Sequence, residues 1–283
     1  MNKDVLWWFD GHWVPANQVS LAFDHPGLMW GAIVTDRTQI RDEKPFRLAA
    51  HIERLMQSAE LAKIPLVADH ESIKNLVEVG IQLNLGKAGK LWQVILLMLP
   101  KSSGAALSIQ FLPQIVGSDQ YKLFPYECTP MELSSVKHRS RLHWWVASQS
   151  VPAGFEPLFT SRLADPFIYE TARANVLAII DGVLVSPPER ETLPGIARKL
   201  IFELAESLSI PTKFRPVLLS ELITAEVVLI TNSTFIMKKV SQIGAQPTSP
   251  GGPTWEKLEN FWLEISAENG LWQDYFSDCP KFH

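Results

Sequence analysis

Apolar positions along this chain of 283 residues follow two periods, one typical of strands and one typical of helices. Alternation and short apolar runs predict strands at 5–14, 91–99, 106–112, 168–180, 183–186 and 226–230, the first being a hairpin around Asp10-Gly11. Helical spacing predicts helices at 47–64, 71–85, 137–150, 195–208 and from Pro253 onward. This irregular order of strands and helices favours an α+β (mixed α/β) fold over a doubly wound sheet.

Residues 113–130 interrupt this pattern, because Pro, Gly, Ser and Asp are frequent there and no regular period is visible. The interruption predicts two domains joined by a linker. Their bounds are 1–118 for an N-terminal α/β domain, 119–130 for the linker and 131–283 for a C-terminal α/β domain. No Gly-rich nucleotide-binding loop follows a strand.

Composition narrows the class of protein further. The net charge of −4 argues against a nucleic-acid partner or a charged membrane surface. Residues 1–13 lack the basic and apolar regions of a signal peptide, and the longest apolar runs are too short to span a bilayer. Two cysteines, Cys128 and Cys279, are too few for a disulfide framework or a metal site, which fits a cytoplasmic setting.

Two features in the second half suggest a cofactor. Glu170 lies inside an apolar strand, and a buried carboxylate needs a positive or proton-bearing partner, although an edge strand facing water would also explain it. Gly195 opens a predicted helix, and the amides of Ile196 and Ala197 can then bind a phosphate, although such junctions are common. Pyridoxal 5′-phosphate (PLP) offers both a ring nitrogen and a phosphate, and requires a lysine for its Schiff base.

Lys137 is the candidate lysine. By its own context, beside His138, Arg139 and Arg141, it is typical of a solvated basic face, yet these neighbours also favour a lowered pKa by repulsion. Arg54 offers a bidentate fork to a phosphate, and its alternative is a surface ion pair with Glu53 or Asp42. Ser233 and Thr234 follow a buried strand and add hydroxyl donors.

These segments together resemble the class IV aminotransferase family, the fold type IV PLP enzymes, which include branched-chain and D-amino acid aminotransferases and aminodeoxychorismate lyases. Each segment is weak alone, but the ordered set covers nearly the whole chain. The segments are 44–59 with Arg54, Val136-Lys137-His138, Tyr169-Glu170 with Asn175-Val176, Leu193-Pro194-Gly195-Ile196 with Arg198, and Glu226-Val227 with Thr231-Asn232-Ser233.

The resemblance implies a role for each matched residue. Lys137 aligns with the Schiff-base lysine and Glu170 with the partner of the pyridine nitrogen. The phosphate binders are Arg54, Ile196, Ala197 and Ser233. The family fold has two α/β domains with PLP in the cleft between them, and the usual assembly is a homodimer whose partner loops complete the site.

Two departures concern the substrate. The family usually has a Tyr-Gly-x-Gly-x-Phe-Glu run where this chain has residues 30–37, with Ile33, Thr35 and Asp36 in place of Gly, Phe and Glu. Trp30, Thr35, Arg37 and Thr234 are therefore candidate substrate residues, and Arg37 is unusual enough to suggest binding of a substrate carboxylate. Leu142 replaces a Tyr found in branched-chain enzymes, as in the D-amino acid and lyase subgroups.

The resulting hypothesis is a PLP-dependent aminotransferase that moves an amino group between an amino acid and a 2-keto acid, similar to branched-chain aminotransferases. Its substrates are its expected partners, with no metal, nucleic acid or membrane involved. Two alternatives stay open: an aminodeoxychorismate lyase that uses the same lysine, and a catalytically lapsed homologue that binds PLP.

Overall fold

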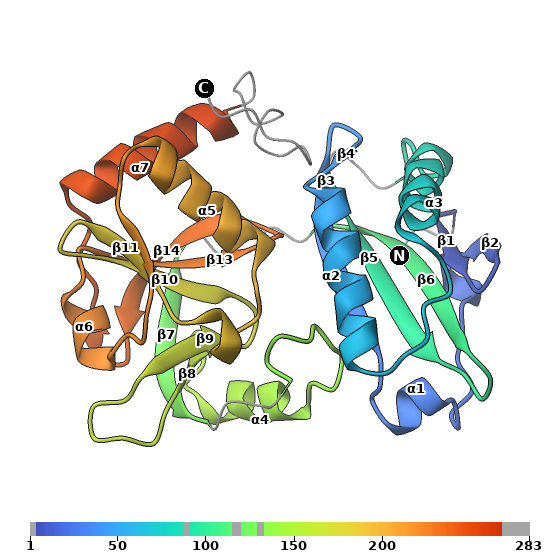
Figure 1. Ribbon diagram of the computed structural model, residues 1–283, viewed down its shortest axis with the longest axis horizontal. Helices are drawn as coiled ribbons and strands as arrows, with labels where there is room; N and C mark the ends of the chain where they lie inside the picture. Colours follow the sequence, from blue (N-terminus) through green and yellow to red (C-terminus); the bar gives the residue numbers. More distant parts are fainter. Residues whose placement is uncertain (1–3, 88–90, 115–119, 129–132, 268–283) are drawn as a thin grey trace. The chain divides into compact units, whose positions relative to one another are not determined.

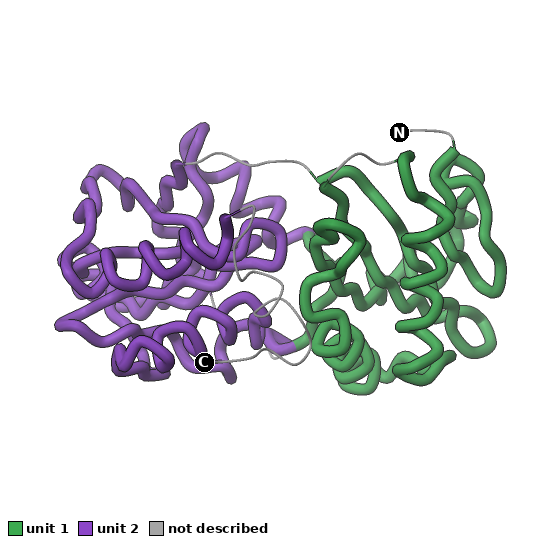
Figure 2. The backbone as a smooth tube through the Cα atoms, turned by 90° about the horizontal axis from the view of Figure 1, so that it is seen from above, with its two compact units in different colours: residues 1–115, 136–141, 276–278 green, residues 116–135, 142–275, 279–283 purple. Residues whose placement is uncertain are grey.

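The alternating and helical patterns form two compact units in the computed structural model, which describes residues 4–87, 91–114, 120–128 and 133–267 (Figure 2). Within this range, unit 1 comprises the residues up to 114 together with 136–141, and unit 2 comprises the rest. Helices and sheets are mixed in both units, as predicted. None of the described helices is long and apolar enough to cross a membrane.

An antiparallel sheet is the framework of unit 1, with strand order β2-β1-β6-β5-β3-β4 (Figure 1). Its strands are β1 (Leu6–Phe9), β2 (His12–Pro15), β3 (Val34–Arg41), β4 (Lys44–Pro45), β5 (Leu91–Pro100) and β6 (Ala105–Pro113). The predicted hairpin and the two predicted buried strands are confirmed as β1–β2, β5 and β6. Thr35 of β3 pairs with Leu97 of β5, and Arg37 with Ile95.

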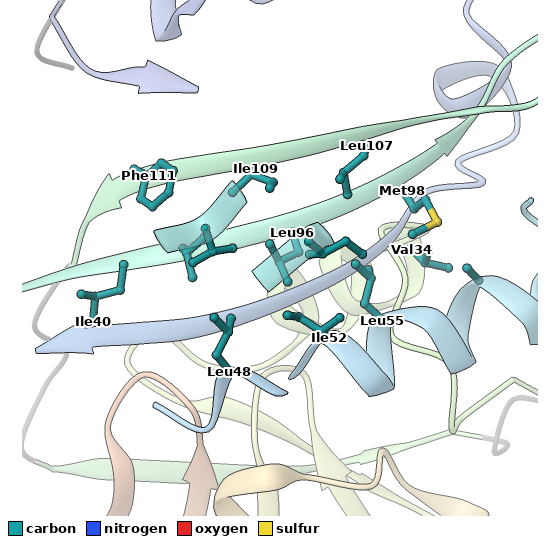
Figure 3. Close-up of a cluster of buried hydrophobic side chains, with 14 of the residues drawn as sticks. Val34, Ile40, Leu48, Ile52, Leu55, Leu96, Met98, Leu107, Ile109 and Phe111 are labelled. Atoms are coloured by element: carbon teal, nitrogen blue, oxygen red, sulfur yellow. The ribbon is translucent and has the colours of Figure 1, made fainter. Parts of the chain in front are cut away.

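Helices α2 (Leu48–Leu61) and α3 (His70–Leu83) confirm the two helices predicted for this unit, and α1 (Pro26–Met29) is a short turn of helix before β3. Ile52 and Leu55 of α2 lie toward Val34 and Leu96 of the sheet (Figure 3). All four side chains are at most 1% exposed, so one face of β3 is buried beneath α2. This packing also aligns the polar side chains that project from α2 with those of β3.

Unit 2 contains a larger, mixed sheet with the order β12-β11-β10-β13-β14-β7-β8-β9, in which β15 also pairs with β14. Its strands are β7 (Tyr121–Glu127), β8 (Glu156–Thr160), β9 (Ile168–Thr171), β10 (Asn175–Ile180), β11 (Val183–Ser186), β12 (Thr212–Phe214), β13 (Val227–Asn232), β14 (Ile236–Ile243) and β15 (Gln246–Pro247). Strand β9 returns to β10 through the pair Glu170 and Asn175, so six of these strands close into a ring.

The helices of unit 2 lie at four places along the chain (Figure 1). They are α4 (Leu142–Ser150), α5 (Ile196–Ser207), α6 (Leu219–Thr224) and α7 (Pro253–Ser266). The helix predicted at 195–208 is confirmed as α5, and the helix predicted from Pro253 is confirmed as α7 as far as Ser266, beyond which the predicted tail lies outside the described residues.

The predicted linker at 119–130 is wrong over most of its described length, because β7 lies there and pairs in parallel with both β14 and β8. Only Leu123 of this strand is fully buried, and Pro125 interrupts it, so neither an alternating nor a continuous apolar pattern is visible. Residues 119, 129 and 130 of the predicted linker lie outside the described residues.

Two further predictions need correction. The helix predicted at 137–150 begins only at Leu142, because residues 137–139 pair with β3 instead. The strand predicted at 168–180 is divided into β9 and β10 by a turn, in which the Thr171 hydroxyl accepts the amide of Ala174 at 2.9 Å. This turn brings Asn175 back beside Glu170.

Candidate active site

Glu170 is held in unit 2 by two neutral donors. Its Oε2 accepts Nδ2 of Asn175 at 3.0 Å and the amide of Leu193 at 3.2 Å. Asn175 Nδ2 also donates to the Leu193 carbonyl at 2.9 Å. Asparagine and amide donors orient a carboxylate without neutralising it, so Glu170 can act toward a positively charged or protonated partner.

The beginning of α5 lies against the same asparagine. Gly195 is its N-cap, and no described side chain caps the helix. A Cβ at position 195 would overlap Oδ1 of Asn175, so only glycine permits this close approach. The first amides of a helix need acceptors, and the two residues that follow, Ile196 and Ala197, begin that first turn. Asn175 therefore contacts both Glu170 and a helix start whose first amides are able to bind an anion.

The loop that leads to Gly195 is fixed by Arg198, whose side chain is 1% exposed. Its guanidinium donates to the Thr192 hydroxyl at 2.9 Å and to Glu189 at 3.2 Å. It also lies over the ring of Phe214, 5.2 Å from the ring centroid. Arg198 is thus a positioning residue for the helix start.

The end of β13 lies beside the same strand, because Asn175 pairs in register with Thr231. The Thr231 hydroxyl is buried, and it has no hydrogen-bond partner among the residues that the structure describes. Asn232 Oδ1 accepts the amides of Thr234 and Phe235 at 2.9 and 3.1 Å, forming a turn that carries Ser233. Unit 2 therefore gathers Glu170, the start of α5 and the hydroxyls after β13.

Arg54 is the centre of a different arrangement in unit 1. Its Nε and Nη2 donate to the two carboxylate oxygens of Asp36 at 2.8 and 2.9 Å. Asp36 is fully buried, and its Oδ1 also lies 2.6 Å from Nδ1 of His51. Burial alone would raise the pKa of Asp36, but Arg54 and His51 outweigh it and hold that pKa well below its usual value. The ion-pair partner of Arg54 is thus Asp36, rather than the expected alternatives Glu53 or Asp42.

The surroundings of His51 favour its neutral form. Burial lowers its pKa most, Arg54 and Lys137 lower it further, and the favourable effect of Asp36 does not compensate. Nδ1 therefore carries the proton donated to Asp36, and Nε2 is a buried acceptor without a partner in the described part of the chain. The ring is thus fixed by one strong hydrogen bond, and it fixes Asp36 in turn.

Lys137 belongs to the same unit as Arg54. Its carbonyl accepts the amide of Thr35 at 2.9 Å, and its amide donates to the Ser58 hydroxyl at 3.2 Å. The preceding residue, Val136, is 3% exposed and packs in the core of unit 1. Both sides of the lysine backbone are therefore attached to the elements that carry Arg54 and Thr35.

The predicted site residues thus fall into two groups. Unit 2 brings together Glu170, Ile196, Ala197, Ser233 and Thr234, and unit 1 brings together Arg54, Lys137, Thr35 and Arg37. Trp30 joins neither group, since it is 82% exposed at the end of α1. No group of three or more His, Cys, Asp or Glu able to hold a metal lies in the described ranges.

The sequence did not indicate four residues that contact or adjoin the candidate site residues: Asp36, His51, Asn175 and Thr231. His51 and Arg54 lie three residues apart on one helix face, and Asp36 is a carboxylate on the strand face that it shares with Val34 and Ile40. That pattern could have suggested a buried ion pair. Asn175 and Thr231 stand in matched segments, but nothing local marks their contacts.

Comparisons with known proteins identify the family of this chain. A family model described as amino-transferase class IV matches residues 34–243. A Methanocaldococcus jannaschii protein whose assigned name is a branched-chain-amino-acid aminotransferase is 25% identical over 268 residues, covering 88% of this chain and 92% of its own. A D-alanine aminotransferase of Staphylococcus aureus is 19% identical over 268 residues, covering 88% and 94%.

Solved structures support the same fold. The branched-chain amino acid aminotransferase of Escherichia coli matches with a TM-score of 0.83 at 19% identity, over 95% of this chain and 96% of that one. The matched family region includes Lys137, Glu170 and the start of α5, and it spans more than half of the chain. The chain therefore belongs to the class IV aminotransferase family and is a transaminase by enzyme class.

Proposed function

We propose that this transaminase uses PLP to move an amino group between an amino acid and a 2-keto acid. The observation that carries the proposal is the contact of Asn175 with both Glu170 and Gly195. It couples a carboxylate suited to a pyridine nitrogen with a helix end suited to a phosphate. PLP contains both of these groups, a pyridine nitrogen and a phosphate.

The residues present fit PLP. Class IV aminotransferases use this cofactor, and a further solved branched-chain amino acid aminotransferase, 17% identical to this chain, contains pyridoxamine 5′-phosphate. In this chain, the absence of a Cβ at Gly195 and the unpartnered hydroxyl of Thr231 among the described residues leave an anion-binding surface at the start of α5. We assign the phosphate to Ile196, Ala197 and Ser233, and Arg54 stays a phosphate binder that the family resemblance predicts.

Each residue then has a defined task. When bound, PLP supplies a ring that accepts electrons from the substrate carbon. Glu170 keeps a proton at the ring nitrogen, since a carboxylate favours the charged form of its partner. Arg54, aligned by Asp36, binds phosphate through its guanidinium. Lys137 provides the amine that holds the cofactor and afterwards moves a proton as general acid and base.

Lys137→Ala tests the proposal directly. We expect purified protein with added PLP to be yellow, and the variant to lose the visible absorbance and to transaminate on the order of 10²–10⁴-fold more slowly, as expected for loss of a proton-transferring group. Lys74→Ala, on the exposed side of α3, is the matched control. A wild-type protein that takes up no PLP, or a Lys137 variant with unchanged spectrum and rate, would contradict the proposal.

The proposal also includes a homodimer in the cytoplasm. Phe23, Met29 and Trp30 are 88%, 64% and 82% exposed and lie close together in sequence around α1. Exposed aromatic and methionine side chains grouped in this way are typical of protein interfaces. The low cysteine content, two in 283 residues, supports a reducing compartment.

A further inference from the structure

Glu156 is a buried carboxylate that has no task in the proposed function. It is the first residue of β8, and it is 6% exposed. Strand β8 pairs with β9 so that Leu158 lies opposite Thr171, which places Glu156 beside the turn after β9. Its Oε1 accepts the Thr171 hydroxyl at 2.6 Å, and its Oε2 accepts Nη2 of Arg173 at 3.0 Å. Both oxygens of the carboxylate therefore bind the turn that joins β9 to β10.

The hydrogen bond from Thr171 is the stronger of these two contacts. The Arg173 side chain is 70% exposed, so water screens its ion pair with Glu156. Thr171 is buried, and its hydroxyl has one proton to donate. The carbonyl of Ala174, at 3.2 Å, competes for that proton, but an ionised carboxylate at 2.6 Å is the stronger acceptor. Glu156 thus fixes the direction of the Thr171 hydroxyl.

The direction of this hydroxyl decides what the Thr171 oxygen can accept. Its lone pairs accept the amides of Arg173 at 3.2 Å and of Ala174 at 2.9 Å. The Thr171 amide in turn donates to the Ala174 carbonyl at 2.9 Å, and these bonds close the turn. A longer bond, from Asn232 Nδ2 to the Arg173 carbonyl at 3.3 Å, supports its exposed side. The buried side of the turn depends on Thr171 and therefore on Glu156.

The same turn sets the position of Glu170. Glu170 immediately precedes Thr171, and Asn175 immediately follows Ala174. Strand β10 pairs with β13 from Asn175 to Ile179, whereas β9 joins β10 through the single register pair of Glu170 and Asn175 among the described residues. A turn that opens would therefore move Glu170 on β9 away from Asn175, whose Nδ2 donates to its Oε2 at 3.0 Å.

We propose that Glu156 is a positioning residue for Glu170: through Thr171 it holds the turn between β9 and β10, so that the Glu170 carboxylate meets the ring nitrogen of the cofactor. This inference rests on the proposed function, because it takes Glu170 as the partner of that nitrogen. A displaced carboxylate no longer favours the protonated form of the nitrogen. Loss of Glu156 should therefore weaken cofactor binding only while Glu170 carries its charge.

Fluorescence titration of the PLP-free protein with PLP tests this dependence without relying on turnover. Glu156→Ala should weaken PLP binding on the order of tenfold, as expected for a lost hydrogen bond to a charged group. Thr171→Val should reproduce this loss, and Glu156→Gln, which keeps an acceptor oxygen for the hydroxyl, should recover most of the affinity. In the background of Glu170→Gln, Glu156→Ala should change the affinity less than about twofold, because no charge is left to position.

Glu226→Ala is the matched control. Glu226 is a half-buried carboxylate that comes just before β13, at the end of that strand opposite Thr231, and its Oε1 accepts the amide of Trp255 at 2.7 Å. Its removal should lower the free energy of unfolding and leave PLP affinity unchanged. An equal loss of PLP affinity in Glu226→Ala and Glu156→Ala would overturn the inference. A loss in Glu156→Ala that is just as large in the Glu170→Gln background would overturn it as well.

Hydrogen exchange in the PLP-free protein tests the first step by itself. The amides of Arg173 and Ala174 should exchange on the order of tenfold faster in Glu156→Ala than in the wild type, because the Thr171 oxygen that accepts them is no longer fixed. Unchanged exchange of both amides would overturn the inference.

The failure of this inference can be separated from failure of the proposed function. Protein that takes up PLP, with an affinity that Glu170→Gln lowers and Glu156→Ala does not, overturns the inference alone. Wild-type protein that takes up no PLP contradicts the proposed function and the inference with it. Faster exchange of the two amides in Glu156→Ala would then show that Glu156 holds the turn for the fold only.

Discussion

The site residues of unit 1 and those of unit 2 are held by different physical means. In unit 1 the central contact is a buried ion pair, with Asp36 between Arg54 and His51. In unit 2 the central residue is the neutral Asn175, and the helix beside it begins at a glycine that a methyl group would disrupt. One half depends on charge, and the other depends on shape.

This difference sets how each half can fail. A buried charge that loses its partner is strongly destabilising, and its balance changes with pH. A close backbone approach is insensitive to pH, but added volume disrupts it. Substitutions that remove a charge from unit 1 or add volume to unit 2 therefore test the two halves separately.

Arg54→Met removes the principal partner of Asp36 and leaves a buried carboxylate. We expect the free energy of unfolding to fall by about 3–5 kcal/mol, the usual cost of breaking a buried pair. Urea denaturation of the PLP-free protein measures this. The double variant with Asp36→Leu should recover much of the loss, since it also removes the orphaned charge.

The matched control for this pair lies in unit 2. Arg215 pairs with Glu221 at 2.7 Å, but both side chains are partly exposed. Arg215→Met should cost no more than about 1 kcal/mol. An equal loss of unfolding free energy in Arg54→Met and Arg215→Met would show that the buried ion pair of unit 1 stabilises the fold no more than an exposed one.

Gly195→Ala tests the shape-dependent half. The new methyl overlaps Asn175 Oδ1, so we expect a loss of about 1–3 kcal/mol in the free energy of unfolding, together with weaker PLP binding. Fluorescence titration with PLP and urea denaturation measure the two effects. In the background of Asn175→Ala the overlap disappears, and the two substitutions should be less costly together than the sum of each alone.

The pH dependence of stability distinguishes the two halves directly. Because the folded-state pKa of His51 lies below its usual 6.5, the unfolded chain binds more protons at acidic pH, and stability falls as the pH drops below that value. Below about pH 4 the depressed pKa of Asp36 adds a loss of the same sign.

His51→Gln should reduce the slope of unfolding free energy between pH 7 and 5, by at most about 1.4 kcal/mol per pH unit for one proton. Thermal denaturation across this range measures the slope. The exposed His12→Gln is the control, and an identical slope in wild type and His51→Gln would contradict the assignment. Gly195→Ala should lower the whole curve without changing its shape.

Trp30→Ser is expected to have the smallest effect on the folded chain, within about 0.5 kcal/mol, since the side chain is 82% exposed. It should nevertheless weaken the proposed dimer, measured by sedimentation velocity over a range of concentrations. Leu163→Ser, at an exposed apolar position of unit 2, is the control. If both variants and the wild type associate equally, Trp30 does not belong to the dimer interface.

The sequence could identify candidate site residues where a single segment carries a recognisable local pattern. Glycine before a periodic apolar face predicted α5, and a carboxylate in an apolar run indicated a role for Glu170, which stays a prediction. The ion pair of Asp36 with Arg54 was not predicted, because its members lie on different elements and only packing of α2 on β3 aligns them.

The surroundings of Lys137 show the same limit. Helical spacing after residue 137 suggested that the helix begins at the lysine, but hydrogen bonds to Thr35 and Ser58 hold it in extended pairing. Strand β7 was not predicted from the sequence for a related reason. It pairs on both sides with strands that come later in the chain, and its own sequence has no alternation of apolar and polar residues that would indicate these pairings.

The return of residues 136–141 to the sheet of unit 1 has a consequence for biosynthesis. The ribosome releases β1 to β6 first, yet Val136, a member of their buried core, and the strand partner of β3 follow only after the chain has begun unit 2. The first unit to be translated is therefore completed only after synthesis of the second unit has begun. A nascent chain that is cut or stalled before residue 136 lacks both the core valine and the lysine that we propose holds the cofactor, so its first unit has an incomplete core.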